Sequence, residues 1–277
     1  MAVINAADVA KLRKVTGAGM MDCKKALEEG EGNFEKAIEI IRKKGQAIAN
    51  KRADRDASEG VVLSKVTADG KCGMTIALNC ETDFVAKNAN FIAFAYSILD
   101  KALASGSKSA EDVNALKLEG SRTVAEVIIE QIGIIGEKLE LSYFARIDAA
   151  HVQPYIHPGN KLATMVGFNK AGVDIQVYKD IAMQIAAMNP VSIDKGDVSE
   201  KVLAQEMDIA REQARREGKP EAMLDKIAEG KLNKFFKEST LLNQEFIKDN
   251  KMTVKQYLQS IEKDLTVTAF IRYTLNL

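Results

Sequence analysis

Cys80, Asp83 and two histidines are the side chains whose chemistry could support a reaction in this sequence. Cys80 and Asp83 lie three residues apart in the stretch NCETDFVAKNANF, residues 79–91. A cysteine paired with a histidine can act as a nucleophile, and an aspartate can act as a general base. His151 and His157 are the only histidines, and the prolines beside them predict a loop. A hydrolase that uses Cys80 or Asp83 is therefore one class of function to weigh.

The spacing of the reactive side chains argues against an enzyme. The three cysteines show no paired spacing, and no HExxH or CxxC pattern predicts a metal site. The TGAG stretch at 16–19 follows no strand and is too short to cradle a phosphate, which favours a glycine-rich turn between helices. Asp83 is better suited to cap a turn that begins at Phe84 than to act as a base. We therefore expect a binding protein with no catalytic residue, no metal and no cofactor.

The charge and composition of the chain argue against a nucleic-acid-binding protein and a membrane protein. The 39 Lys and Arg residues balance 39 Asp and Glu residues, so the net charge is zero. A sequence-independent nucleic-acid binder normally carries an excess of basic residues that neutralise phosphates. No stretch approaches the ~18 apolar residues of a membrane span, and the N-terminal residues lack the apolar run of a signal peptide. A reducing cytoplasm is the simplest compartment, although an organelle would give the same sequence features.

The hydrophobic pattern predicts an α+β fold that begins with a helical module. Residues 1–45 read as three short helices, with breaks at Gly17 and Gly19 and a helix N-cap at Asn33. Residues 46–59 are charged and only weakly periodic, so we expect them to form a linker.

Two related subdomains are expected to follow, each an antiparallel sheet with helices on one face. Residues 60–150 contain two strand patterns joined at Asp69-Gly70, then helices, then a last alternating strand. Residues 151–277 repeat this order, and the strands LSYFARI and VTAFIRY that close the two halves share Phe-x-Arg. Residues 199–228 interrupt the second half with a charged sequence and a thin apolar seam, which predict a projecting helical hairpin.

Two groups of apolar residues can belong either to the core or to a partner contact. A strand pattern ends at Asn79 and a helix pattern begins near Phe91, so Phe84 lies in a connection between them. Residue type alone favours a phenylalanine that folds back into the core. Adjacent helix positions point about 100° apart, so we expect one of Met20 and Met21 to be exposed.

Four stretches of the sequence resemble the elongation factor Ts family of bacterial translation factors. They are LRKVTGAGMMDCKKALEE at 12–29, NCETDFVAKN at 79–88, IAMQIAAMNP at 181–190 and EGKLNKFFKESTLLNQEFIKD at 229–249. The first two are long and specific, and the resemblance runs from the first helix to near the last strand. It implies an N-terminal three-helix module of the ubiquitin-associated type, a linker, a core of two related subdomains and a coiled-coil hairpin inserted in the second.

The resemblance also implies a function and a set of contact residues. Members of this family are guanine-nucleotide exchange factors of the GTPase elongation factor Tu. Their TDFV motif lies at an exposed tip that inserts near the magnesium site of the GTPase, and their N-terminal module grips the G domain. The residues of this chain that match are Thr82, Asp83, Phe84 and Val85 in the tip, and Arg13, Met20, Met21 and Lys24 in the module.

One position departs from the family pattern. Some relatives carry His near the GTPase phosphate loop where this chain carries Gln184, whose amide can hydrogen-bond but cannot become a cation. By resemblance we expect Gln184 to contact the partner. The expected partner is elongation factor Tu, with no direct binding of nucleotide, nucleic acid or membrane. An RNA- or ribosome-binding translation factor without exchange activity remains the alternative.

Overall fold

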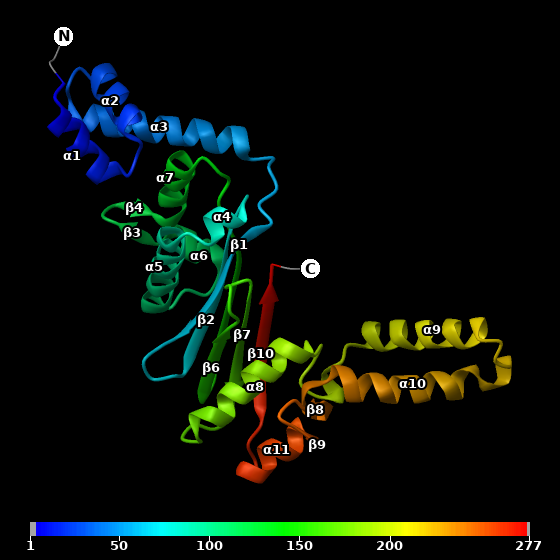
Figure 1. The fold of residues 1–277 in the computed structure, drawn as a ribbon. Helices are drawn as coiled ribbons and strands as arrows, with labels where there is room; N and C mark the ends of the chain where they lie inside the picture. The colour runs from blue at the N-terminus through cyan, green and yellow to red at the C-terminus, as the bar shows by residue number, and fades with distance from the viewer. Residues whose placement is uncertain (1–3, 276–277) are drawn as a thin grey trace.

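Three parts follow one another along the molecule: an N-terminal helical module, a central pair of sheets with helices, and a projecting hairpin (Figure 1). The computed structural model describes residues 4–275. The expected module 1–45 and second subdomain 151–277 extend into residues 1–3 and 276–277, which lie outside the described residues. Helices combined with small antiparallel sheets confirm the predicted α+β class.

The N-terminal module consists of α1 (Ala6–Thr16), α2 (Met20–Glu29) and α3 (Phe34–Arg52). The side chain of Asn33 caps α3 by accepting a hydrogen bond from the N–H of Lys36. Gly17 ends α1 with a φ of 70°, a left-handed conformation that favours glycine. A small apolar cluster that includes Leu12 and Leu27 lies between the three helices.

The linker between the module and the first subdomain is shorter than predicted, because α3 does not end at Gly45. The helix continues to Arg52, so residues 46–52 of the predicted linker 46–59 are helical. The reason is a close crossing with α7 (Val124–Ile135), in which a Cβ on Gly133 would lie 2.7 Å from the Cα of Gly45. Two glycines let the helix backbones touch there. The remaining faces of α3 lie in water, which explains their charged and weakly periodic sequence.

The first subdomain is a three-stranded antiparallel sheet with helices on its outer face (Figure 1). Its strands are β1 (Glu59–Val66), β2 (Cys72–Cys80) and β5 (Glu140–Asp148), in the order β1-β2-β5. Its other elements are α4 (Asp83–Ala86), α5 (Ala89–Ser105), α6 (Ala110–Ala115), a small hairpin of β3 (Lys117–Glu119) and β4 (Arg122–Thr123), and α7. Apolar residues of β1 and β2 pack against α5, which places the core of this subdomain between sheet and helices.

The second subdomain repeats this plan. Its sheet has the order β10-β7-β6, from β10 (Val267–Thr274), β7 (Leu162–Phe168) and β6 (His151–Ile156). Its other elements are α8 (Ile175–Met188), a small hairpin of β8 (Glu245–Phe246) and β9 (Asp249–Thr253), and α11 (Val254–Ile261). The side chains of α8 pack on the sheet in an apolar cluster separate from that of the first subdomain.

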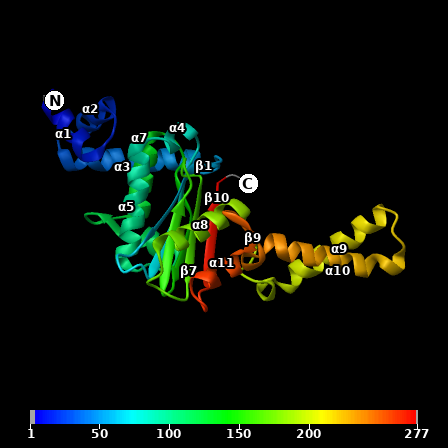
Figure 2. The same cartoon turned by 60° about the horizontal axis from the view of Figure 1, so that its bottom comes forward.

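The two sheets pack against each other through small and aromatic residues, with helices on the outer faces (Figure 2). Ala77 of β2 and Ala163 of β7 belong to one buried cluster at this interface. The rings of Tyr143 and Tyr273 stack there with their centroids 3.8 Å apart. The two sheets approach closely at Gly73, where a Cβ would lie 2.3 Å from the sulfur of Met165 and 2.7 Å from a methyl group of Val152.

The predicted loop around the two histidines is confirmed for His157, which lies in a turn with Pro158, and is wrong for His151, because residues 151–156 form the edge strand β6. Pro154 fits there because an edge strand has backbone groups that need no partner in the sheet. His151 stacks on Tyr178 with ring centroids 3.9 Å apart, and His157 follows the strand, with its Nδ1 3.0 Å from the hydroxyl of Tyr155.

The hairpin consists of α9 (Glu200–Arg216) and α10 (Leu224–Ser239), and it projects from the second subdomain (Figure 1). It is longer than the predicted range 199–228, because α10 continues to Ser239. Its seam is narrow and contains the buried residues Ala214 and Ala228, as the thin apolar stripe predicted. Ion pairs such as Arg211 with Asp225, 2.8 Å apart, flank this seam.

We expect the hairpin to be dispensable for folding. Replacing residues 207–231 with a short Gly-Ser linker should leave one cooperative thermal transition with a similar midpoint, since these residues pack mainly on each other. Circular dichroism during heating measures this. Loss of the transition would show that the seam residues stabilise the core.

The glycine crossing gives a second expectation. Gly133→Ala should lower stability by about 1–3 kcal/mol, because the added methyl meets the backbone of Gly45 and forces the helices apart. Gly230→Ala in α10 is the matched control, because its added Cβ meets no atom within 4 Å. Urea denaturation compares the two variants. Equal stability in both would contradict a close-packed crossing.

Candidate partner-binding site

Phe84 is exposed on α4, a single helical turn between β2 and α5. Its side chain is 83% exposed, which overturns the expectation from residue type that it folds into the core. Buried Ala86 and half-buried Val85 are the apolar residues of α4 that pack against the core of the first subdomain. A phenylalanine in water at the end of a short helix is an available apolar contact.

Thr82, and not Asp83, caps this helix. The hydroxyl of Thr82 accepts a hydrogen bond from the N–H of Val85 at 3.5 Å, the long limit of such a bond. The predicted cap, Asp83, is the first residue of the helix, because the turn begins one residue earlier than expected. Its carboxylate pairs with Lys87 at 2.6 Å, and the pKa of Asp83 is lowered chiefly by the hydrogen bond from this lysine.

The segment before α4 is held by side chains that the sequence analysis did not single out. The carboxylate of Glu137 accepts hydrogen bonds from the N–H groups of Glu81 and Thr82, at 3.1 and 3.0 Å, and from the Thr82 hydroxyl at 2.6 Å. Glu81 in turn pairs with Arg52, at the end of α3, at 2.7 Å. No local pattern marks these contacts, because Glu137 is 56 residues from Glu81 along the chain.

Both adjacent methionines of α2 are exposed, where only one was expected to be. Met20 is 42% exposed and Met21 is 64% exposed. The buried core of the module is formed by other residues of this stretch, among them Ala18, Cys23 and Leu27. Val15, 55% exposed, adds a third apolar side chain on the same module.

The two predicted basic contact residues of the module also lie on its surface. Arg13, in the last turn of α1, is exposed. Lys24 of α2 is exposed and forms an ion pair with Glu28 at 3.8 Å. An exposed ion pair of this kind contributes little to stability, so it leaves Lys24 free to exchange partners.

The module and the tip lie next to each other on the molecule. Gly17, in the turn between α1 and α2, and Val85 of α4 line one surface cleft of about 470 Å³, together with Ile134 of α7. The exposed apolar residues of the module and Phe84 are therefore presented by neighbouring parts of the structure.

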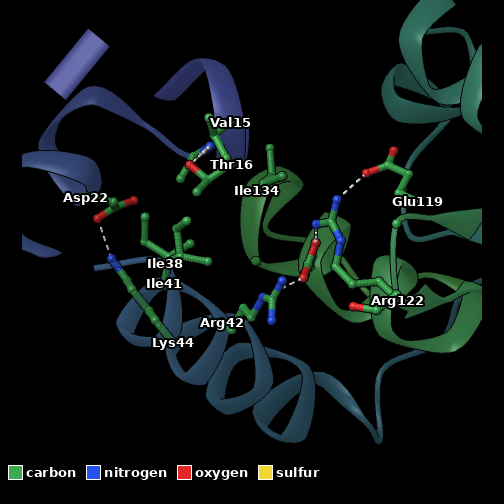
Figure 3. Close-up of a pocket in the computed structure, with 16 residues that line it drawn as sticks. Val15, Thr16, Asp22, Ile38, Ile41, Arg42, Lys44, Glu119, Arg122 and Ile134 are labelled. Carbon is green, nitrogen blue, oxygen red and sulfur yellow. Dashed lines mark hydrogen bonds and ion pairs between the residues drawn. The ribbon is translucent and has the colours of Figure 1, made fainter. Parts of the chain in front are cut away.

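A separate cavity of about 300 Å³ lies between the module and the first subdomain (Figure 3). Its lining includes the apolar side chains of Ile41 on α3 and Ile134 on α7. Arg42 and Arg122 also line it, and both pair with the carboxylate of Glu130. Glu119 also pairs with Arg122, and Asp22 pairs with Lys44 in the same lining. The acidic and basic side chains of the cavity therefore balance, and it offers no excess charge that would attract a nucleotide phosphate.

Gln184 does not lie on the surface, which contradicts the prediction that it contacts a partner. Its side chain is fully buried on α8. The amide nitrogen donates to the carbonyl of Glu245 at 3.1 Å, and the amide oxygen accepts from the N–H of Ile247 at 2.8 Å. Its spacing from Ile181 and Ile185 along the helix was the signal that it faces inward. Gln184 therefore supports the turn between β8 and β9.

Asp180, one helical turn before Gln184, holds the same turn from the other side. This carboxylate is only 4% exposed, and it accepts hydrogen bonds from Lys248 and from Gln176, both at 2.6 Å. A buried charge of this kind is tolerable because it is paired and hydrogen-bonded. Ile247 lies between Glu245, which Gln184 contacts, and Lys248, which Asp180 contacts. Its side chain is 43% exposed.

Cys80 and His151, which were considered as a catalytic pair, do not lie together in the structure. Cys80 is fully buried, and its burial, followed by the charge of Glu137, raises the pKa of the thiol to about 12. A thiol with this pKa is not a nucleophilic thiolate near neutral pH. His151 packs on Tyr178 in the second subdomain, whereas Cys80 belongs to the core of the first.

Within residues 4–275, no group of three or more His, Cys, Asp or Glu side chains is arranged to hold a metal ion. In the same part of the chain, no helix combines the length and the apolar character that crossing a membrane requires.

Comparison with known proteins identifies the family. The family model described as Elongation factor TS matches residues 81–276. Elongation factor Ts of Porphyromonas gingivalis is 55% identical over 269 residues, which cover 97% of this chain and 97% of that protein. Elongation factor Ts of Cytophaga hutchinsonii is 51% identical over 278 residues, with 100% of both chains covered. On this evidence the chain belongs to the elongation factor Ts family.

Proposed function

We propose that this protein is a translation elongation factor that binds elongation factor Tu and promotes the release of its GDP. The observation that carries the proposal is Phe84, 83% exposed on a short helix whose base is fixed by hydrogen bonds. In this role Phe84 and Asp83 enter the GTPase beside its magnesium and phosphate site, and Thr82 and Val85 support them. The proposal assigns the protein to the cytoplasm, where elongation takes place.

Such a function needs binding energy and no bond-making chemistry. A GTPase that holds GDP with nanomolar affinity binds it by roughly 12 kcal/mol. A protein that binds the nucleotide-free form more tightly than the GDP form weakens GDP binding by the same factor. The buried thiol of Cys80 and the paired carboxylate of Asp83 are consistent with a factor that is not an enzyme.

Phe84 cannot supply all of the required energy. Burying its side chain in a partner stabilises the complex by ~1.5–3 kcal/mol, which is small beside the grip on GDP. The N-terminal module supplies a second contact through Met20 and Met21, with Arg13 and Lys24 beside them. The second subdomain supplies a third, for which exposed Ile247 at the anchored turn between β8 and β9 is available.

Phe84→Ala tests the proposal directly. We expect GDP release from elongation factor Tu to be roughly ten- to a hundredfold slower than with the unchanged protein, because about 1.5–3 kcal/mol of partner contact is lost. The free energy of unfolding should change by less than about 0.5 kcal/mol, since the side chain is exposed. Stopped-flow release of fluorescent GDP and urea denaturation measure the two quantities.

Ile261→Ala is the matched control for that experiment. Ile261 is also an exposed apolar residue, 47% exposed, but it lies on α11 at the end of the molecule away from α4 (Figure 1). Its removal should leave GDP release unchanged. Normal release with Phe84→Ala, together with a large loss of stability, would refute the role of Phe84.

Met20→Ala combined with Met21→Ala tests the contact from the module. The double variant should bind elongation factor Tu about tenfold more weakly, as expected when exposed contact residues are truncated. Its stability should be nearly unchanged, whereas Leu27→Ala in the same helix should lose about 2–5 kcal/mol because Leu27 is buried. Titration calorimetry and urea denaturation measure both effects. Unchanged affinity in the double variant would remove α2 from the binding surface.

A further inference from the structure

We propose that Glu137 is a positioning residue that holds α4 in the orientation from which Phe84 meets the GTPase, an inference that rests on the proposed function. Glu137 follows α7, which ends at Gly136 with a φ of 80°, and it precedes β5. The positive φ turns the chain so that the Glu137 carboxylate lies against the segment between β2 and α4. Glu137 therefore acts through Phe84 and does not need to touch the partner.

The chemistry of the contact suits a carboxylate and no neutral side chain of the same size. One oxygen of Glu137 accepts from the N–H groups of Glu81 and Thr82, at 3.1 and 3.0 Å, and the other accepts from the Thr82 hydroxyl at 2.6 Å. All of these partners are donors, and an ionised carboxylate is an acceptor only. Hydrogen bonds to a charged acceptor are also stronger than neutral ones.

The contact with Glu137 also determines that the Thr82 hydroxyl acts as an acceptor in the hydrogen bond that caps α4. Because the Thr82 hydroxyl donates its hydrogen to Glu137, its lone pairs are free to accept from the N–H of Val85. A helix of four residues cannot hold itself together in water, so its orientation depends on such outside contacts. Glu137 thereby fixes both the entry and the first turn of the helix that carries Phe84.

A second set of contacts ties this segment to the N-terminal module. Glu81 accepts hydrogen bonds from one nitrogen of Arg52 at 2.7 and 2.9 Å, and from the N–H of Lys138 at 2.6 Å. Arg52 is the last residue of α3, the helix that crosses α7. Residues 137–138 thus hold residues 81–82, and Arg52 joins residues 81–82 to the module. These contacts fix the position of α4 relative to the N-terminal module.

Holding the tip in place before binding increases the rate of exchange for a physical reason. A contact residue that is ordered in advance loses less conformational freedom when the complex forms. If α4 could swing, part of the energy from burying Phe84 would be lost to ordering the turn. Removing the Glu137 contact should therefore weaken the effect of Phe84 even though Phe84 itself is unchanged.

Glu137→Gln is the variant that tests this proposal. Glutamine keeps the shape of the side chain, but its NH₂ group must face either the two backbone N–H groups or the Thr82 hydroxyl, so part of the contact is lost. We expect GDP release to be about tenfold slower than with the unchanged protein. Glu140→Gln is the matched control, because Glu140 is an exposed carboxylate of the same segment whose ion-pair partner is Lys138, and it should have no effect.

A double-mutant cycle separates positioning from general destabilisation. If Glu137 acts through Phe84, then adding Glu137→Gln to Phe84→Ala should slow GDP release no further. Slowing by the same factor in both backgrounds would overturn the proposal, because it would show that Glu137 acts independently of Phe84. GDP release with Glu137→Gln at the rate of the unchanged protein would also overturn it.

Amide hydrogen exchange of the free protein separates this inference from the proposed function. The N–H groups of Val85, Ala86 and Lys87 are hydrogen-bonded within and before α4. Glu137→Gln should make them exchange about tenfold faster, and Glu140→Gln should leave them unchanged. Unchanged protection in Glu137→Gln would refute the positioning role whatever the exchange assay shows. If the unchanged protein does not speed the release of GDP from elongation factor Tu, the proposed function is refuted, and this measurement remains valid.

Discussion

The contact between the two sheets determines where the helices of both subdomains can lie. Each sheet has three strands, and the surfaces that meet carry small residues such as Ala77, Ala163 and Gly73. With the inner faces filled, the helices of both subdomains must cover the outer faces. The connections at the strand ends are then left in water, and α4 is one of them.

Two exposed apolar residues are supported in the same way. Phe84 stands on a segment whose backbone N–H groups are bound by Glu137, and Ile247 stands on a turn whose N–H is bound by Gln184. In both places a polar side chain from a neighbouring element satisfies backbone groups that no strand or helix pairs. This fixes a loop without burying the apolar residue that the loop carries.

The N-terminal module is joined to the first subdomain by a close helix crossing and by an ion pair. The glycine crossing of α3 with α7 brings the backbones together, and the ion pair of Arg42 with Glu130, 3.1 Å apart, lies beside it. The pair of Arg52 with Glu81 then connects the end of α3 to the segment before α4. The proposed binding surface is therefore a single arrangement of module and tip, in which the separation of the contacts is set before a partner arrives.

Composition, periodicity and caps predicted the α+β class, the helical module and the projecting hairpin. Resemblance added the family and the exposed position of Phe84. These follow from local periodicity, caps and motifs, which short stretches record. Three other features became visible only in the folded chain: α3 continues past Gly45, both Met20 and Met21 are exposed, and Gln184 is buried.

The structure also shows the hydrogen bonds that Glu137 accepts from Glu81 and Thr82, which no local pattern predicted. The physical reason is that these features depend on contacts between residues far apart in sequence. Gly45 meets Gly133, and Glu137 meets Thr82 across 55 positions of the chain. Residue types and spacing within one element carry no record of which distant element packs against it.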